Sequence, residues 1–297
     1  MKIGSKKLRL LTAMVTPMKA DLSVDFAKAE QLADFLIAHG SDALVVAGTT
    51  GESPTLTKDE KLQLFAAVKS ASGGRAAIIA GTGGNDTASS IDLTLKAEKL
   101  GVDGCMLVTP YYNKPPQAGL FRHFSMIAEQ TALPILLYVV PGRTGVNMTS
   151  DTTVSLARKY ANIIAVKEAS GSLDQAAEIV SGAPEGFSVL SGDDNLTLPL
   201  MSVGADGIVS VASHICGNEI RQMVYAFAAG DAAGAAKMHR RLLPVFKSMF
   251  ITTNPIPVKA SLSLVGIEAG PVRPPLVDIT PAEMEKVRSA AKSAGLI

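Results

Sequence analysis

Eight short apolar runs, each ending in a polar or glycine-containing turn, recur along the chain at intervals of about 25 to 35 residues. Segments with helical periodicity separate them. Near-continuous hydrophobicity is typical of strands that are covered on both faces, as in parallel sheets. The alternation predicts an α/β fold, and eight repeats predict a closed (β/α)8 TIM barrel. The predicted strands are Leu8–Thr16, Ala43–Ala47, Ala76–Ala80, Gly104–Thr109, Pro134–Val140, Ile163–Lys167, Phe187–Leu190 and Gly207–Val211.

The segments between the strands carry helix start and stop signals. Thr57 followed three residues later by Glu60 predicts a capping box at a helix N-terminus. Gly40, Gly73 and Gly101 each follow an apolar-periodic stretch and predict helix C-terminal caps. These signals support the reading of the intervening segments as helices.

The alternation of strands and helices stops near residue 230. We therefore expect a catalytic barrel domain over residues 1–230 and a C-terminal helical extension over residues 231–297. Because no low-complexity or Pro- and Ser-rich linker intervenes, the extension is expected to pack on the barrel. The extension's predicted helices are Asp231–Phe250, Pro257–Val265 and Pro281–Ala294.

Composition narrows the function classes. The 297-residue chain carries 28 Lys and Arg against 27 Asp and Glu, so it lacks the broad field that gathers nucleic acid or anionic membrane. Two cysteines are too few for a disulfide scaffold, and no apolar run reaches the roughly 18 residues of a membrane span. The four histidines are scattered without metal-ligand spacing. A metal-free cytoplasmic enzyme is the expectation.

Lys167 ends a strand of four apolar residues, at the barrel rim where active sites of this fold form. A strand-end lysine is commonly a structural or solvated cation, but it can also be a reactive amine. Tyr138 ends the preceding strand, and neighbouring strands lie only about 4.8 Å apart. A phenol beside an amine can move the protons that Schiff-base formation requires. A core tyrosine with a satisfied hydroxyl is the alternative.

Three loops carry weaker signals. Residues 48–53 (Gly-Thr-Thr-Gly-Glu-Ser) offer hydroxyls and backbone N–H groups that could cradle a carboxylate, or could serve only a turn and a helix cap. Arg143, in a segment expected to be a flexible loop, has the forked donor that suits a substrate carboxylate, although a surface arginine is the alternative. Tyr111 and Tyr112 are either packing aromatics or polar contributors to the site.

Together the motifs resemble those of the dihydrodipicolinate synthase family. The resemblance spans nearly the whole chain, and the motifs stand in the expected order. One departure is Val139, where the family commonly has asparagine. The matching segments are Gly48–Glu52, Val108–Asn113, Tyr138–Gly145, Val166–Glu168, Ser191–Asp194 and Asn254–Lys259.

The resemblance implies a class I lyase that condenses pyruvate with L-aspartate-4-semialdehyde. Pyruvate would be held as a covalent imine on Lys167, with no other cofactor and no metal. It also implies a homotetramer built as a dimer of dimers, although sequence leaves dimer and tetramer both open. The other implied roles are proton transfer by Tyr138, relay by Thr50 and Thr49, insertion of Tyr112 from a neighbouring subunit, clamping of the aldehyde carboxylate by Arg143, and binding of pyruvate at Thr50, Val209 and Gly192.

Two alternatives keep the same scaffold. A pyruvate-dependent aldolase or a sugar-acid dehydratase would share Lys167 and Tyr138 but use another second substrate. A catalytically silent barrel would serve binding or assembly. Many members of the family respond to lysine, but Lys58, Lys61 and Ser89 depart from the sensitive pattern. Weak or absent lysine inhibition is therefore expected.

Overall fold

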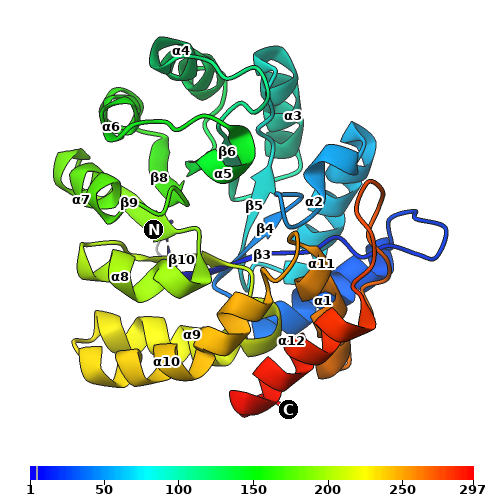
Figure 1. Cartoon of the computed structure of the whole chain (residues 1–297). Coiled ribbons are helices and arrows are strands. Elements are labelled where there is room, and N and C mark those ends of the chain that lie inside the picture. Colours follow the sequence, from blue (N-terminus) through cyan, green and yellow to red (C-terminus); the bar gives the residue numbers. More distant parts are fainter. Residues whose placement is uncertain (5) are drawn as a thin grey trace. The chain divides into compact units, whose positions relative to one another are not determined.

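Eight strands pair in parallel as a closed barrel, which confirms the predicted fold class (Figure 1). The structure is a computed structural model and describes residues 1–4 and 6–297. The strands follow one another in the order β10-β3-β4-β5-β6-β7-β8-β9. Their bounds are β3 (Leu10–Ala13), β4 (Ala43–Val46), β5 (Ala77–Gly81), β6 (Gly104–Val108), β7 (Ile135–Val139), β8 (Ile163–Glu168), β9 (Ser188–Ser191) and β10 (Gly207–Ser210).

The first barrel strand is shorter than the predicted run Leu8–Thr16. β3 ends at Ala13, and soon afterwards the backbone N–H of Val15 donates to Nε2 of His214 at 3.1 Å. Nδ1 of the same ring lies 2.8 Å from the carbonyl oxygen of Val211. A buried histidine therefore takes over a backbone donor that a neighbouring strand would otherwise have satisfied.

The predicted helix signals are confirmed. The Thr57 hydroxyl accepts the N–H of Glu60, and the Glu60 carboxylate accepts the N–H of Thr57 at 2.8 Å. Gly40, Gly73 and Gly101 all have positive φ at or just past a helix end. The helices are α1 (Phe26–Ala38), α2 (Lys58–Ser72), α3 (Thr87–Lys99), α4 (Gln117–Ala128), α5 (Pro141–Thr144), α6 (Ser150–Lys159), α7 (Leu173–Gly182), α8 (Thr197–Ser202), α9 (Ser213–Ala228), α10 (Ala232–Ser248), α11 (Ile256–Ser261) and α12 (Pro281–Ser293), with the 3-10 turns η1 (Ser53–Thr55), η2 (Asp194–Leu196) and η3 (Leu262–Val265).

The chain forms two compact units, of which the first comprises residues 1–9 and 79–209. In this unit β6, β7, β8 and β9 pair consecutively, α3 packs on α4, and α6 packs on α7 (Figure 1). A short antiparallel pair, β1 (Lys2–Ile3) with β2 (Lys6–Lys7), precedes the barrel and was not predicted. The first unit therefore contains β7 and β8, the strands that carry Tyr138 and Lys167.

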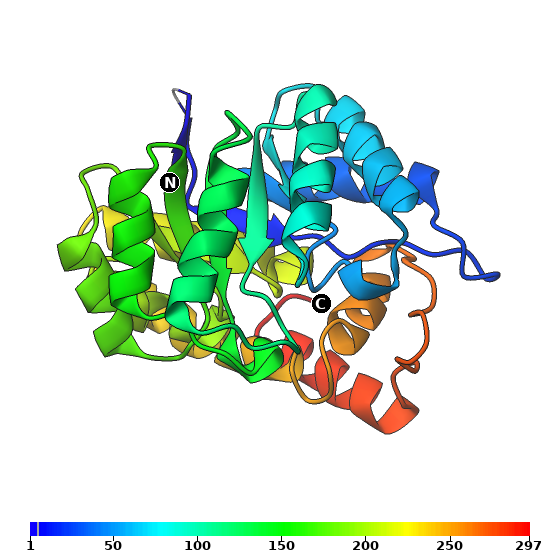
Figure 2. The same ribbon diagram turned by 90° about the horizontal axis from the view of Figure 1, so that it is seen from above.

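The second unit comprises residues 10–78 and 210–297. The three helical stretches expected near the C-terminus are formed as α10, α11 with η3, and α12. α10 packs on α9, and α12 packs on both α10 and α11; Figures 1 and 2 both show the orange α11 beside the red α12. The division into a barrel of residues 1–230 and an extension of residues 231–297 stays a prediction.

No helix of the described ranges, 1–4 and 6–297, is both long enough and apolar enough to cross a membrane. Apolar residues make up 47% of the chain, and many of them form the buried core. Each barrel strand except β6 and β8 is buried along its whole length, and those two each have one half-buried residue. This pattern agrees with strands that are covered on both faces.

Candidate active site

Lys167 and Tyr138 lie side by side at the ends of β8 and β7. The two residues are partners in the parallel register, and Nζ of Lys167 lies 4.2 Å from the centroid of the Tyr138 ring. Both side chains are buried, with 4% and 5% of the residue exposed. The predicted juxtaposition of amine and phenol is confirmed.

Lys167 is unusual among buried lysines in what surrounds its amine. In the part of the chain that the structure describes, no carboxylate forms an ion pair with it. Asp193 feels the charge of Lys167: burial raises the pKa of the Asp193 carboxyl, and the positive charge of Lys167 acts to lower it. A buried amine held by an aromatic ring and not by a carboxylate remains available for chemistry.

Gly192 is a glycine because Lys167 and its neighbours leave no room for a side chain. A Cβ at this position would lie 2.5 Å from Cβ of Ala169 and 3.2 Å from Cε of Lys167. Its backbone N–H donates to the carbonyl oxygen of Glu168 at 2.7 Å. Gly192 is therefore close to Lys167, as the resemblance implied, and keeps the space beside the amine open. Its contact with pyruvate stays a prediction.

Glu168 follows Lys167 and is almost wholly buried, with 1% of the residue exposed. Oε1 accepts the backbone N–H of Ser170 at 2.6 Å, and Oε2 accepts Nε2–H of Gln175 at 2.9 Å. Burial raises the pKa of the Glu168 carboxyl, and the hydrogen bonds from Ser170 and Gln175 act to lower it. Sequence reasoning missed this carboxylate and its partner.

Arg143 lies in a short helical turn, so the expectation of a loop at this position is wrong. The segment forms α5, with Pro141 at its start and Gly145 at a left-handed C-terminal cap, φ 70°. The Thr144 hydroxyl donates to the carbonyl oxygen of Val140 at 3.1 Å. Proline at the first turn and glycine at the cap favour a helical turn. The Arg143 side chain is exposed at this turn.

Tyr112 and Val209 occupy opposite environments in the first unit. Tyr112 is 89% exposed, and its φ of 73° is costly for a residue with a bulky side chain. Val209 lies in β10 and is fully buried. The roles of Tyr112 and Val209 stay predictions.

Thr49 and Thr50 lie in the second unit, directly after β4. Thr49 is half-buried, whereas Thr50 is 2% exposed, and its hydroxyl accepts Nδ2–H of Asn254 at 3.0 Å. The Thr16 hydroxyl donates to the carbonyl oxygen of Gly51 at 2.7 Å. Asn254 therefore orients the Thr50 hydroxyl, a role that its place 204 residues away conceals in the sequence.

The same loop contains a buried ion pair. Glu52 adopts left-handed backbone with φ 57°, and its Oε1 lies 2.8 Å from Nζ of Lys259. Its Oε2 accepts the backbone N–H of Arg273 at 2.8 Å. Burial lowers the pKa of Lys259, and the charge of Glu52 acts to raise it.

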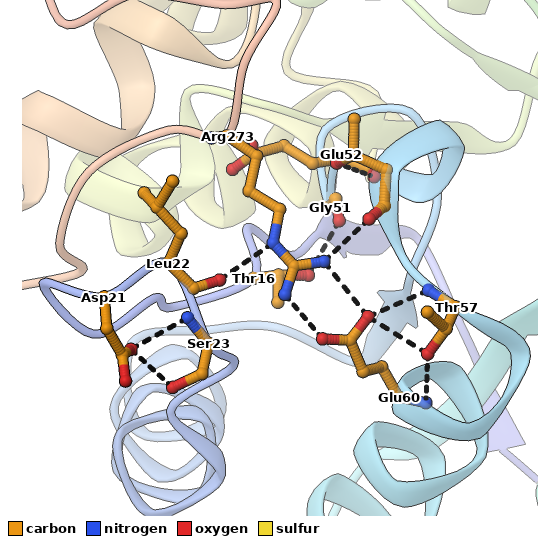
Figure 3. A network of polar contacts seen from close by, with 10 residues as sticks. Thr16, Asp21, Leu22, Ser23, Gly51, Glu52, Thr57, Glu60 and Arg273 are labelled. Atoms are coloured by element: carbon orange, nitrogen blue, oxygen red, sulfur yellow. Dashed lines mark hydrogen bonds and ion pairs between the residues drawn. The ribbon is translucent and has the colours of Figure 1, made fainter.

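Arg273 extends the network to the start of α2. Its guanidinium contacts both carboxylate oxygens of Glu60 and donates to the carbonyl oxygens of Leu22 and Thr55 (Figure 3). The hydrogen bond from Arg273 is the main reason why the pKa of Glu60 falls to about 2. The loop after β4 is thus fixed by charged groups from the C-terminal segment. The sequence contains Glu52 and Lys259 in separate motifs but no signal that joins them.

Among residues 1–4 and 6–297, no group of three or more His, Cys, Asp or Glu side chains is placed so that it could hold a metal ion. The two cysteines, Cys105 and Cys216, are free and buried. The predicted site residues offer a buried amine, a phenol, hydroxyls and an exposed arginine. Lys167, Tyr138 and Gly192 come together in the first unit, while Thr49 and Thr50 stand with Asn254 and Glu52 in the second.

Known proteins resemble this chain along nearly its whole length. Residues 6–294 match the dihydrodipicolinate synthetase family. The 4-hydroxy-tetrahydrodipicolinate synthase of Moorella thermoacetica is 59% identical over 289 residues, which are 97% of this chain and 99% of that protein.

Two solved structures are similar in fold and sequence. DHDPS from Cyanidioschyzon merolae with lysine bound is 49% identical with a TM-score of 0.96, and the match covers 97% of this chain and 98% of the other. The chloride-inhibited dihydrodipicolinate synthase of Acinetobacter baumannii complexed with pyruvate is 38% identical with a TM-score of 0.94, and the match covers 98% and 99% of the two chains.

Proposed function

This chain belongs to the dihydrodipicolinate synthetase family, and we propose that it condenses pyruvate with L-aspartate-4-semialdehyde to 4-hydroxy-tetrahydrodipicolinate in lysine and diaminopimelate biosynthesis. The observation that carries the proposal for this chain's own residues is the pair Lys167 and Tyr138. A buried amine, which has no ion pair within the described part of the chain, lies 4.2 Å from the centroid of a phenol ring at the matched ends of two parallel strands.

The reaction begins when the free amine of Lys167 attacks the keto carbon of pyruvate. The carbinolamine loses water to give a protonated imine, and loss of a methyl proton gives an enamine. The imine is itself the electron sink, so the proposal needs no metal and no organic cofactor. Gly192 keeps space beside the amine, and Val209 is proposed to contact pyruvate through its backbone.

Protons must reach and leave the carbinolamine oxygen and the methyl carbon. Tyr138 is the proposed donor and acceptor, since its ring lies against the Lys167 amine. Thr50 would pass protons onward and Thr49 would assist, because the parallel strands of a barrel of this type direct their carboxyl-terminal loops to the catalytic rim. The hydrogen bond from Asn254 would fix the Thr50 hydroxyl in this role.

The second substrate supplies an aldehyde, a carboxylate and an amine. Arg143, exposed on α5, is proposed to bind its carboxylate with a forked pair of hydrogen bonds. The enamine carbon attacks the aldehyde carbon, and the aldehyde oxygen becomes the product hydroxyl. The substrate amine then attacks the imine carbon, closes the ring and releases Lys167.

The active assembly is proposed to be a homotetramer, a dimer of dimers, in which Tyr112 enters the site of a neighbouring subunit. The 89% exposure of Tyr112 and its strained φ of 73° support a surface that a partner covers. The proposed location is the cytoplasm, where free thiols such as those of the two cysteines persist.

Trapping and kinetics test the proposal together. Reduction with borohydride in the presence of pyruvate should add one pyruvate-derived group, on the peptide that contains Lys167. Turnover with aspartate semialdehyde should then exceed cleavage or dehydration of sugar acids by orders of magnitude. An adduct without condensation would favour the aldolase or dehydratase alternative, and absence of any adduct would contradict the imine mechanism.

A further inference from the structure

The carboxylate next to Lys167 has an unusual set of partners. Glu168 is 1% exposed, and the donors that reach its carboxylate among residues 1–4 and 6–297 are uncharged, namely the backbone N–H of Ser170 and the amide of Gln175. Its backbone is part of the strand register, because the residue pairs with Val139 on β7 and Ser191 on β9. The strand pairing therefore holds the backbone of Glu168, and with it the end of β8, whether or not the Glu168 side chain keeps its partners.

Gln175 uses both ends of its amide. Nε2 donates to Oε2 of Glu168 at 2.9 Å and to the carbonyl oxygen of Met148 at 3.3 Å. Oε1 accepts Nδ2–H of Asn147 at 2.7 Å. A carboxylate and a carbonyl only accept, so the amide can satisfy all three partners in one orientation alone. Gln175 is 9% exposed, and its amide is thus set by the groups around it.

Asn147 and Met148 belong to the segment that leaves α5, the turn that carries Arg143. Gln117, the first residue of α4, also forms hydrogen bonds to this segment. Its Nε2 donates to the carbonyl oxygen of Asn147 at 2.7 Å, and its Oε1 accepts the backbone N–H of Thr149 at 3.1 Å. The exit of α5 is therefore held between two glutamine amides.

We propose that Gln175 is a positioning residue for the second-substrate step: it fixes the α5 turn of Arg143 against the end of β8 that presents Lys167. The inference rests on the proposed function, because it assumes that Arg143 binds the aldehyde substrate. The Gln175 amide is hydrogen-bonded to Glu168 on β8 and also to Asn147 and Met148. It therefore links the end of β8 to the segment that follows α5. Pyruvate binds at Lys167 before the aldehyde is needed, so imine formation does not require the link.

The main test compares Gln175→Ala with the wild-type enzyme. Loss of one hydrogen bond to a charged group changes the equilibrium constant of the process that it supports by about tenfold. We expect KM for aspartate semialdehyde to rise about tenfold, with KM for pyruvate and the yield of borohydride-trapped adduct within about twofold of wild type. Asn147→Ala, at an exposed position, should shift the same parameter in the same direction by a smaller factor. Gln175→Glu, which keeps the shape but replaces the donor, should not rescue Gln175→Ala.

Asn162→Ala is the matched control. Asn162 lies just before the first residue of β8, at the strand end away from Lys167. Its Nδ2 donates to the carbonyl oxygens of Ala128 and Thr131 at 3.0 and 2.9 Å. It should lower the melting temperature without changing either KM. An unchanged aldehyde KM in both Gln175→Ala and Asn147→Ala would overturn the proposal, as would an equal rise of both KM values. If the wild-type enzyme formed no pyruvate adduct, the proposed function would fail first, and that outcome is read from wild type alone.

Discussion

Two lysines of this protein are equally buried and have opposite surroundings. Lys167, 4% exposed, lies against the ring of Tyr138 and has no ion-pair partner among residues 1–4 and 6–297. Lys259, 3% exposed, lies 2.8 Å from the Glu52 carboxylate, which also accepts the backbone N–H of Arg273. The first lysine is in the first compact unit and the second is in the other.

The difference shows what a buried cation needs in order to be structural. A charge removed from water is tolerated when a close opposite charge and further hydrogen bonds compensate it. Lys259 has this compensation, so its amine is occupied and holds the loop after β4. Lys167 lacks it, and an amine that stays available in an apolar setting can act as a nucleophile. Burial alone therefore does not distinguish the reactive lysine from the structural one.

Replacing Lys167 by alanine should have the largest effect on activity. We expect turnover to fall by more than about 10³-fold, because the nucleophile is lost, and the pyruvate adduct to disappear. The melting temperature should stay within a few degrees of wild type, because no ion pair is broken. Mass spectrometry after borohydride reduction gives the readout, with circular dichroism as the folding control. An undiminished adduct would place the imine on another lysine.

Replacing Lys259 by methionine should have the largest effect on stability. Glu52 would remain buried without its cation, which typically costs about 3–5 kcal/mol. Urea unfolding measures this loss, and borohydride trapping of the folded fraction should still label Lys167. The double variant Lys259→Met with Glu52→Gln removes both charges and should recover much of the loss. If the single variant were as stable as wild type, Lys259 would not be the structural lysine of this comparison.

Tyr138→Phe tests whether the ring or the hydroxyl makes Lys167 productive. The ring that lies 4.2 Å from Nζ is kept, so the amine should remain in place. Loss of the hydroxyl should slow imine formation by about 10²-fold, the lower end of what a positioned proton donor contributes. Stopped-flow trapping at saturating pyruvate gives the rate. A rate equal to wild type would assign proton transfer to another group.

The Glu60 carboxylate, which is paired with Arg273 in the network around Lys259, should make the stability of the protein depend on pH. Its pKa in the folded state is about 2, lowered from 4.5 mainly by the hydrogen bond from Arg273. Its stabilisation is therefore complete above pH 4.5 and is lost as the pH falls toward 2. We expect on the order of 1–2 kcal/mol after allowance for solvent screening. Glu60→Gln should be less stable than wild type by this amount at pH 6, and the gap in urea unfolding should narrow below pH 4.5 and close only as the pH falls to about 2.

The smallest predicted effect is that of free lysine on the reaction rate, and it involves a third lysine side chain, Lys61. Lys61 is half-buried on α2, and burial lowers its pKa. With Lys58 it stands in the segment that the resemblance associates with lysine feedback, while Ser89 stands where a carboxylate would attract the ligand's ammonium. Millimolar lysine should therefore change the initial rate at saturating pyruvate by less than about twofold, since like charges repel. Cooperative inhibition would contradict this expectation.

Local patterns predicted much of the fold. The eight apolar runs became the strands of the barrel because near-continuous hydrophobicity is a property of the segment itself. The adjacency of Tyr138 and Lys167 followed because consecutive parallel strands are neighbours. The segment at Arg143 is a helical turn and not the expected loop, although Pro141 and Gly145 carry the helical signal in the sequence.

The sequence by itself determined which segments are strands and helices, and which amine ends a strand beside a phenol. Only the tertiary structure decided the partners of the buried charges. Glu52 and Lys259 are 207 residues apart, and Thr50 is joined to Asn254 across 204 residues. Propensity and periodicity depend on neighbours along the chain, whereas the compensation of a buried charge depends on which distant segment packs against it.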